Sequence, residues 1–142
     1  MPDPDSGTVL GFDPGQRRIG VAVGEALLGT ARGLATLPAR NGQPEWAEVA
    51  ALLERWAPQA LVVGLPSHAD GTDSDSTALA RRLAGRLHGR FGLPAHTVDE
   101  RLSSHAAEER LEPRQRQRDP QAIHAEAAAV ILETYFAQQG RA

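Results

Sequence analysis

Residues 8–23 read TVLGFDPGQRRIGVAV, an apolar run that ends in an acid, turns through Pro-Gly and continues as a second β-branched run. This pattern predicts a β-hairpin whose first strand is largely buried and carries Asp13 at its end. Gly11 and Gly15, two residues to either side of Asp13, leave the backbone uncovered, so a metal ion or a metal-bound phosphate can approach closely. In the alternative interpretation, Asp13 only caps its own Asp-Pro-Gly turn.

The composition predicts a single domain over residues 1–142, with residues 1–7 as a frayed lead-in. The chain has no cysteine, which excludes a disulfide framework and a thiolate metal site. It also lacks both a membrane-length apolar run and a signal-peptide pattern, so we expect a cytoplasmic protein without a membrane partner. The net charge is −3, and a nucleic acid must therefore be bound by local basic patches.

Hydrophobic periodicity predicts strands at residues 9–12, 19–23, 30–37, 60–64 and 96–98. It predicts helices at residues 44–56, 76–91, 103–111 and 119–138. Residues 60–64, ALVVG, are wholly apolar, as is typical of a parallel strand covered on both faces. Residues 38–42 are interpreted as an exit loop. The order of elements predicts an α/β fold, with a five-stranded mixed sheet flanked by helices on both faces.

Three candidate site residues follow from this topology: Asp13 at the end of the first strand, Glu100 just after the fifth, and His124 near the start of the last helix. Sites in open α/β sheets form outside the carboxyl ends of the strands. Two carboxylates and a third ligand suit a hard divalent ion that organises a phosphodiester and an attacking water. Alternatively, Glu100 pairs with Arg101 or caps the helix near Ser103.

Several blocks of the sequence, in order from residue 9 to 136, resemble the YqgF/RuvX family of small bacterial proteins. The blocks are LGFDPG (10–15), RIGVAV (18–23), TAR (30–32), VGLP (63–66), DGT (70–72), DERLS (99–103) and AAAVIL (127–132). The family is described as pre-16S ribosomal RNA nucleases or as Holliday-junction resolvases. The resemblance implies an RNase H-like fold and phosphodiester cleavage with Mg²⁺ or Mn²⁺, and it matches Asp13 and Glu100 to two acidic positions of the family.

The third acidic position of the family corresponds here to His124, and the nearest carboxylate is Glu126. On a helix, His124 shares the apolar stripe with Ile131 and Tyr135, which should pack on the sheet, whereas Glu126 shares a solvated face with Glu133. We therefore expect His124 at the site, as a neutral metal ligand or as a packing residue. An imidazole is a poor ligand for Mg²⁺ and a better one for Mn²⁺.

Basic side chains beside these acids are the candidate contacts for nucleic acid, because guanidinium groups hold a phosphate backbone. They are Arg17, Arg18, Arg101, Arg114, Arg116 and Arg118. Arg82, Arg86 and Arg90 recur every four residues and are interpreted as solvated helix charge. Aromatic residues make up only 4% of the chain, which favours recognition of backbone and shape over a base-stacking platform.

The favoured hypothesis is a metal-dependent endonuclease that processes the 5′ end of precursor 16S ribosomal RNA. A Holliday-junction resolvase acting on branched DNA would need a stable symmetric dimer, and no strong apolar dimer face stands out, so we expect a monomer or a weak dimer. A phosphate-binding fold of the sugar-kinase/actin type needs two domains, for which this chain is too short. A catalytically weak RNA-binding factor of ribosome assembly is the non-enzymatic alternative, motivated by His124.

Overall fold

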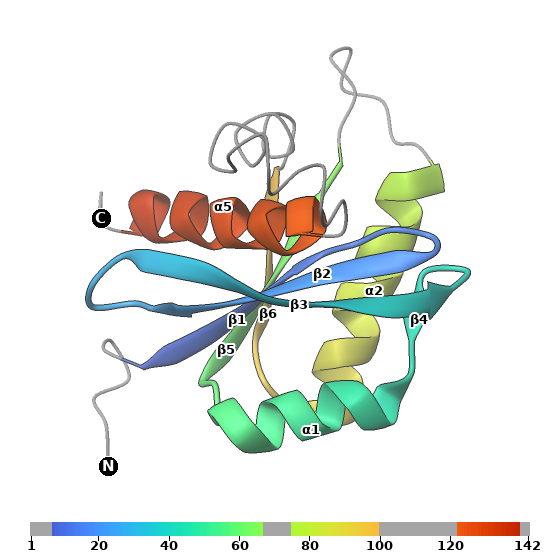
Figure 1. Cartoon of the computed structure of the whole chain (residues 1–142), viewed down its shortest axis with the longest axis horizontal. Coiled ribbons are helices and arrows are strands. Elements are labelled where there is room, and N and C mark those ends of the chain that lie inside the picture. Colours follow the sequence, from blue (N-terminus) through green and yellow to red (C-terminus); the bar gives the residue numbers. More distant parts are fainter. Residues whose placement is uncertain (1–6, 67–74, 100–121, 140–142) are drawn as a thin grey trace.

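The computed structural model describes residues 7–66, 75–99 and 122–139, in which one sheet carries helices on both sides (Figure 1). The elements are β1 (Thr8–Asp13), β2 (Arg18–Glu25), β3 (Thr30–Arg40), β4 (Gln43–Pro44), α1 (Trp46–Trp56), β5 (Ala60–Leu65), α2 (Asp75–Phe91), β6 (Ala95–Asp99) and α5 (Ala122–Gln139). The predicted helix at residues 103–111 lies outside the described residues. No described helix is both long and apolar enough to cross a membrane.

The sheet has the strand order β4-β3-β2-β1-β5-β6 and is mixed, as predicted. Short turns connect the strands from β1 to β4, so these strands pair antiparallel, whereas the crossovers through α1 and α2 make β5 and β6 parallel to β1. The parallel arrangement brings the carboxyl ends of β1, β5 and β6 to one edge of the sheet. That edge is where the candidate residues were expected.

Among the described residues the sheet contains six strands, so the predicted count of five was wrong. The sixth is the two-residue β4, which pairs Ala39 with Pro44 and Arg40 with Gln43. Its turn is Asn41-Gly42, and both residues have positive φ angles, 52° and 79°. Two such residues form the primed turn that matches the twist of paired strands. The segment interpreted as an exit loop is therefore a tight hairpin that lengthens β3.

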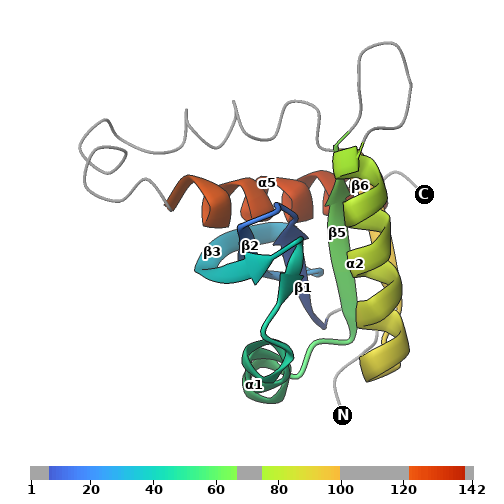
Figure 2. The same ribbon diagram turned by 90° about the vertical axis from the view of Figure 1, so that its right-hand side faces the viewer.

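Helices cover both faces of the sheet, as predicted (Figure 2). On one face, α5 packs on a core that includes Val9, Val62 and Val98. On the opposite face, α1 and α2 pack on a second core that includes Leu10 and Phe12. Strand β5 contributes side chains to both cores, and Leu61, Val62 and Val63 are fully buried. The sequence of β5 is apolar throughout because both of its faces are buried, as expected of a central parallel strand.

Candidate active site

Asp13 ends β1 on the face of the sheet that α5 covers. Leu10 and Phe12 belong to the core under α1 and α2, so alternation along the strand turns Val9 and Asp13 toward α5. Asp13 is only 7% exposed. A carboxylate so far removed from water needs compensation by a cation or by hydrogen-bond donors. This burial favours a functional carboxylate over the alternative in which Asp13 only caps its own turn.

Helix α5 reaches Asp13 because the strand beneath it has a glycine at the critical position. Gly20 of β2 is the register partner of Asp13. A Cβ atom built on Gly20 would lie 1.9 Å from the carbonyl oxygen of His124 and 2.3 Å from its carbonyl carbon. The backbone of the first turn of α5 therefore rests directly on β2. Any side chain at this position would push the helix, and His124 with it, away from the sheet.

This close packing brings His124 to Asp13, as the sequence predicted. The Nδ1 atom of His124 lies 3.9 Å from Oδ2 of Asp13, and the His124 side chain is 40% exposed whereas that of Asp13 is 9% exposed. The separation is too long for a direct hydrogen bond. It is shorter than the sum of two metal–ligand bonds of about 2.1 Å each, so one divalent ion can touch both atoms. The exposed imidazole leaves the pair open to substrate.

These two side chains fit a metal ion only in part. Within the described ranges, no group of three His, Asp or Glu side chains is placed to hold a metal. An oxygen-preferring divalent ion takes several ligands, so Asp13 and His124 require a third protein ligand or substrate oxygens. A carboxylate together with an imidazole is a donor set better suited to Mn²⁺ than to Mg²⁺.

The third candidate, Glu100, lies outside the described residues. Its neighbour Asp99 ends β6 at the same edge of the sheet, in register with Leu65 at the end of β5. β5 in turn pairs with β1, whose last residue is Asp13. The role of Glu100 as a ligand remains a prediction that rests on this shared edge.

A basic pocket lies at the turn between β1 and β2, a few residues after Asp13 along the chain. Its volume is about 290 Å³, and it is lined by Arg17, Arg18, Thr36 and Pro38. Two backbone hydrogen bonds hold the turn: Ala39 N–H donates to the carbonyl of Arg17 at 2.8 Å, and Gly42 N–H to that of Gln16 at 3.0 Å. Both guanidinium groups belong to exposed residues on a fixed backbone. Arg101, Arg114, Arg116 and Arg118 lie outside the described residues.

The prediction of which side of the last helix packs on the sheet is right for His124, whereas the prediction of a solvated side is wrong for Glu133. Ile131 of the predicted apolar stripe is fully buried, and Tyr135 stacks on the ring of His96 at 5.3 Å. The face that was expected to be solvated is half-buried instead, and Glu133 Oε2 accepts the backbone N–H of Ala31 in β3 at 3.4 Å. The helix is apolar on nearly every side and packs against β3, so it has no fully solvated flank at this point.

Sequence reasoning missed two contributors to this region. Gly20 was not singled out, although an isolated glycine inside a strand indicates close approach of another backbone. Thr36 was missed because nothing in the sequence shows that β3 brings its side chain beside Arg17 and Arg18. The contact between Gly20 and His124 joins residues about a hundred positions apart, and only the fold reveals it.

Comparison with known proteins identifies the family. The RuvX family model, described as Holliday junction resolvase, matches residues 7–138. The chain belongs to this family. A relative from Chromohalobacter salexigens, named "Putative pre-16S rRNA nuclease", is 52% identical over 132 residues, which cover 91% of this chain and 88% of the relative. A relative of the same name from Alcanivorax borkumensis is 50% identical over 129 residues, covering 91% of this chain and 95% of the relative.

Two solved structures with the same fold are Holliday junction resolvases of low sequence identity to this chain. Thermus thermophilus RuvC in complex with a Holliday junction superposes with a TM-score of 0.58 at 20% identity, covering 96% of this chain and 98% of that one. The Fowlpox virus Holliday junction resolvase superposes with a TM-score of 0.60 at 10% identity, covering 93% and 99%. These likenesses confirm the predicted RNase H-like fold. The family and its relatives are nucleases, so the chain belongs to a class of enzymes that hydrolyse phosphodiester bonds, as predicted.

Proposed function

We propose that this protein is a metal-dependent endonuclease that processes the 5′ end of precursor 16S ribosomal RNA in the cytoplasm. One observation carries the proposal: a buried carboxylate, Asp13, faces the ring of His124 at 3.9 Å, at the edge of the sheet where β1, β5 and β6 end. The names of relatives at about half identity support the choice of RNA as substrate.

The three candidate ligands have different roles, which follow from their charge and position. Asp13 supplies a fixed negative charge for a divalent ion, His124 supplies a nitrogen donor while its ring is neutral, and Glu100 supplies the second carboxylate. The ion, when bound, polarises the phosphodiester and lowers the pKa of an attacking water. Arg17 and Arg18 hold the phosphate backbone of the substrate beside this centre, because guanidinium groups bind phosphate oxygens without reading sequence.

A second candidate function is cleavage of four-way DNA junctions, which the description of the family favours. A resolvase needs two active sites held in a symmetric dimer to cut two strands, whereas processing of one RNA end needs only one site. Purified protein with Mg²⁺ or Mn²⁺ should cleave a precursor 16S fragment and leave a four-way junction intact. Junction cleavage without RNA cleavage would favour the second function, and binding of RNA without cleavage would favour an assembly factor.

Changing His124 to aspartate tests whether its ring occupies a ligand position. The added carboxylate faces Asp13 across the site and lies in the first turn of a helix, where a negative charge is favourable. We expect stronger binding of Mg²⁺ and faster Mg²⁺-supported cleavage, because oxygen ligands suit this ion better than an imidazole does. Titrations of both metals measure the effect. His124→Asn, which lacks the charge, is the control, and equal metal dependence in all three proteins would make His124 a packing residue.

Replacing both arginines of the basic pocket tests how this surface binds the nucleic-acid backbone. Arg17→Gln with Arg18→Gln should weaken binding of single-stranded RNA regardless of sequence. The slope of log affinity against log salt should become shallower by about 0.7 for each phosphate that the variant no longer neutralises. Arg82→Gln with Arg86→Gln on α2 is the matched control, since it removes the same charge from exposed positions. Equal slopes in the two double variants would contradict the assignment.

A further inference from the structure

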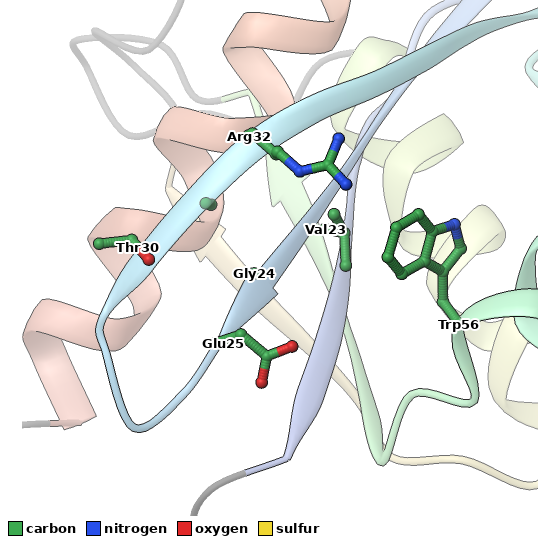
Figure 3. Close-up of a pocket in the computed structure, with 7 residues that line it drawn as sticks. Val23, Gly24, Glu25, Thr30, Arg32 and Trp56 are labelled. Carbon is green, nitrogen blue, oxygen red and sulfur yellow. The ribbon is translucent and has the colours of Figure 1, made fainter.

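A second pocket lies on the opposite face of the sheet, at the end of the β2–β3 hairpin remote from Asp13 (Figure 3). Its volume is about 240 Å³. Val23 forms its apolar floor, the indole of Trp56 at the end of α1 forms one wall, and Glu25 and Arg32 border it. The volume is below the range of about 300–1,000 Å³ typical of sites for drug-sized ligands, so the pocket suits one small ring system.

The two charged side chains of this pocket face it from opposite sides. Figure 3 shows the carboxylate of Glu25 on one side of Val23 and the guanidinium of Arg32 on the other. The hydroxyl of Thr8 donates to Oε1 of Glu25 at 2.8 Å, which fixes the carboxylate and leaves Oε2 and the second lone pair of Oε1 for a ligand. The guanidinium carbon of Arg32 lies 5.3 Å from the centre of the Trp56 ring. The pocket thus offers a flat cationic surface, an apolar wall and an anchored acceptor.

We propose that this pocket binds a single unpaired nucleobase of an RNA strand, with guanine preferred. Unpaired bases stack on guanidinium planes and on aromatic rings and are recognised through their Watson–Crick edges. Guanine carries two adjacent N–H donors on that edge, which a carboxylate accepts together, whereas uracil carries a single N–H donor flanked by two carbonyl oxygens that would face Glu25 unfavourably. One such pocket is compatible with the low aromatic content, because it holds one base and is not a stacking platform.

The position of the pocket gives it a role separate from that of Asp13. Asp13 is paired with Gly20 at one end of the hairpin, and Glu25 is paired with Thr8 at the other end. Glu25 lies five positions beyond Gly20 in β2, which corresponds to about 17 Å along the strand. A base held here therefore belongs to a nucleotide some way from the cleaved bond. Its use in selecting the RNA substrate rests on the proposed function, whereas binding of a free nucleotide does not.

The test uses the full chain labelled with ¹⁵N, in the presence of a chelator, so that the metal site takes no part. The chain has two tryptophans, and Trp46, which packs against Phe91, is an internal reference for the indole signal of Trp56. Titration with GMP should shift the Trp56 signal to saturation, with an affinity at least about tenfold higher than that for UMP. The affinities for AMP and CMP, which carry one exocyclic amine each, should lie between those for GMP and UMP.

Two conservative variants separate recognition from folding. Glu25→Gln keeps an acceptor for Thr8 but loses the charge, and it should abolish the preference for GMP. Arg32→Lys keeps the charge but loses the stacking plane, and it should weaken binding of every nucleotide. Glu54→Gln, at an exposed position of α1, is the matched control and should bind as the unmodified chain does.

Three results would overturn the inference. They are no saturable shift with any nucleotide, a preference for GMP that survives Glu25→Gln, and self-association in sedimentation that moves the Trp56 signal without nucleotide. The last result would assign the pocket to a second copy of the chain, whose Leu27 and Leu28 are more than 70% exposed. None of these results depends on cleavage, and loss of cleavage in an Asp13 variant does not affect the nucleotide titration.

Discussion

Substitution of Asp13 by asparagine is expected to reduce cleavage of a precursor 16S fragment by about a hundred- to ten-thousandfold. Asparagine keeps the shape of the side chain but removes the charge that holds a divalent ion. A metal ion contributes several kcal/mol to stabilisation of the transition state, and each 1.36 kcal/mol corresponds to about a tenfold change in rate. Initial rates at saturating Mg²⁺ and Mn²⁺ measure the effect, and calorimetry should show weaker binding of both ions.

Folding should survive this change, which separates a functional role from a structural one. Asp13 is 7% exposed, so loss of its charge relieves a desolvation cost, and the melting temperature should stay the same or rise. Glu54→Gln removes one charge from an exposed position of α1 and is the matched control for net charge. Full cleavage by the Asp13→Asn protein would place the active centre elsewhere or assign the activity to a contaminant.

The elements that were predicted correctly are those whose sequence pattern lies within one short stretch of the chain. The β1–β2 hairpin follows from two β-branched runs around Pro-Gly, and β5 follows from its wholly apolar sequence. Strand β4 was missed even though the sequence contains a signal for the turn before it. Asn41-Gly42 is a strong hairpin signal. The two-residue strand after it is too short to show any periodicity. A turn signal was thus available, but a strand signal was not.

The positions of candidate site residues were predictable where the end of a strand or the periodicity of a helix determines them. A strand end placed Asp13 at this edge of the sheet. The family resemblance pointed to His124, helical periodicity favoured it over Glu126, and the structure places its ring 3.9 Å from Asp13. Periodicity failed for Glu133, because a helix covered on nearly every side has no polar face to identify. Glu100, Arg101, Arg114, Arg116 and Arg118 remain predictions, since they lie outside the described residues.

Close approach between backbones leaves only a weak signal in sequence, an isolated glycine within a strand, and the sequence alone does not show which backbone approaches Gly20. Gly11, Gly20, Gly24 and Gly33 all lie beneath α5, and a Cβ on any of them would approach an atom of this helix within 3 Å. Gly11 was expected to leave room for a metal ion, but Leu132 of α5 occupies the space next to it, and Gly20, Gly24 and Gly33 were not singled out from the sequence. Together they let the helix backbone rest on the sheet, and the separation of His124 from Asp13 depends on that contact.

Substitution of Gly20 by alanine should therefore damage stability and activity together. The added methyl group would lie 1.9 Å from the carbonyl oxygen of His124, so α5 must move away by about 1 Å. Overpacking of this kind costs about 1–3 kcal/mol of the free energy of unfolding. A displacement of about 1 Å at a catalytic group can cost about a hundredfold in rate. Urea unfolding and cleavage assays on the same preparation measure both effects.

Gly85→Ala is the matched control, because Gly85 lies within α2 and a Cβ there meets nothing within 4 Å. The same substitution at that position should raise stability by about 1 kcal/mol, since alanine favours a helix over glycine. If the free energy of unfolding falls in Gly20→Ala and rises in Gly85→Ala, the loss at Gly20 is due to the contact with His124. A fully active Gly20→Ala protein of unchanged stability would show that α5 adjusts without moving His124, and it would remove Gly20 as a determinant of the site.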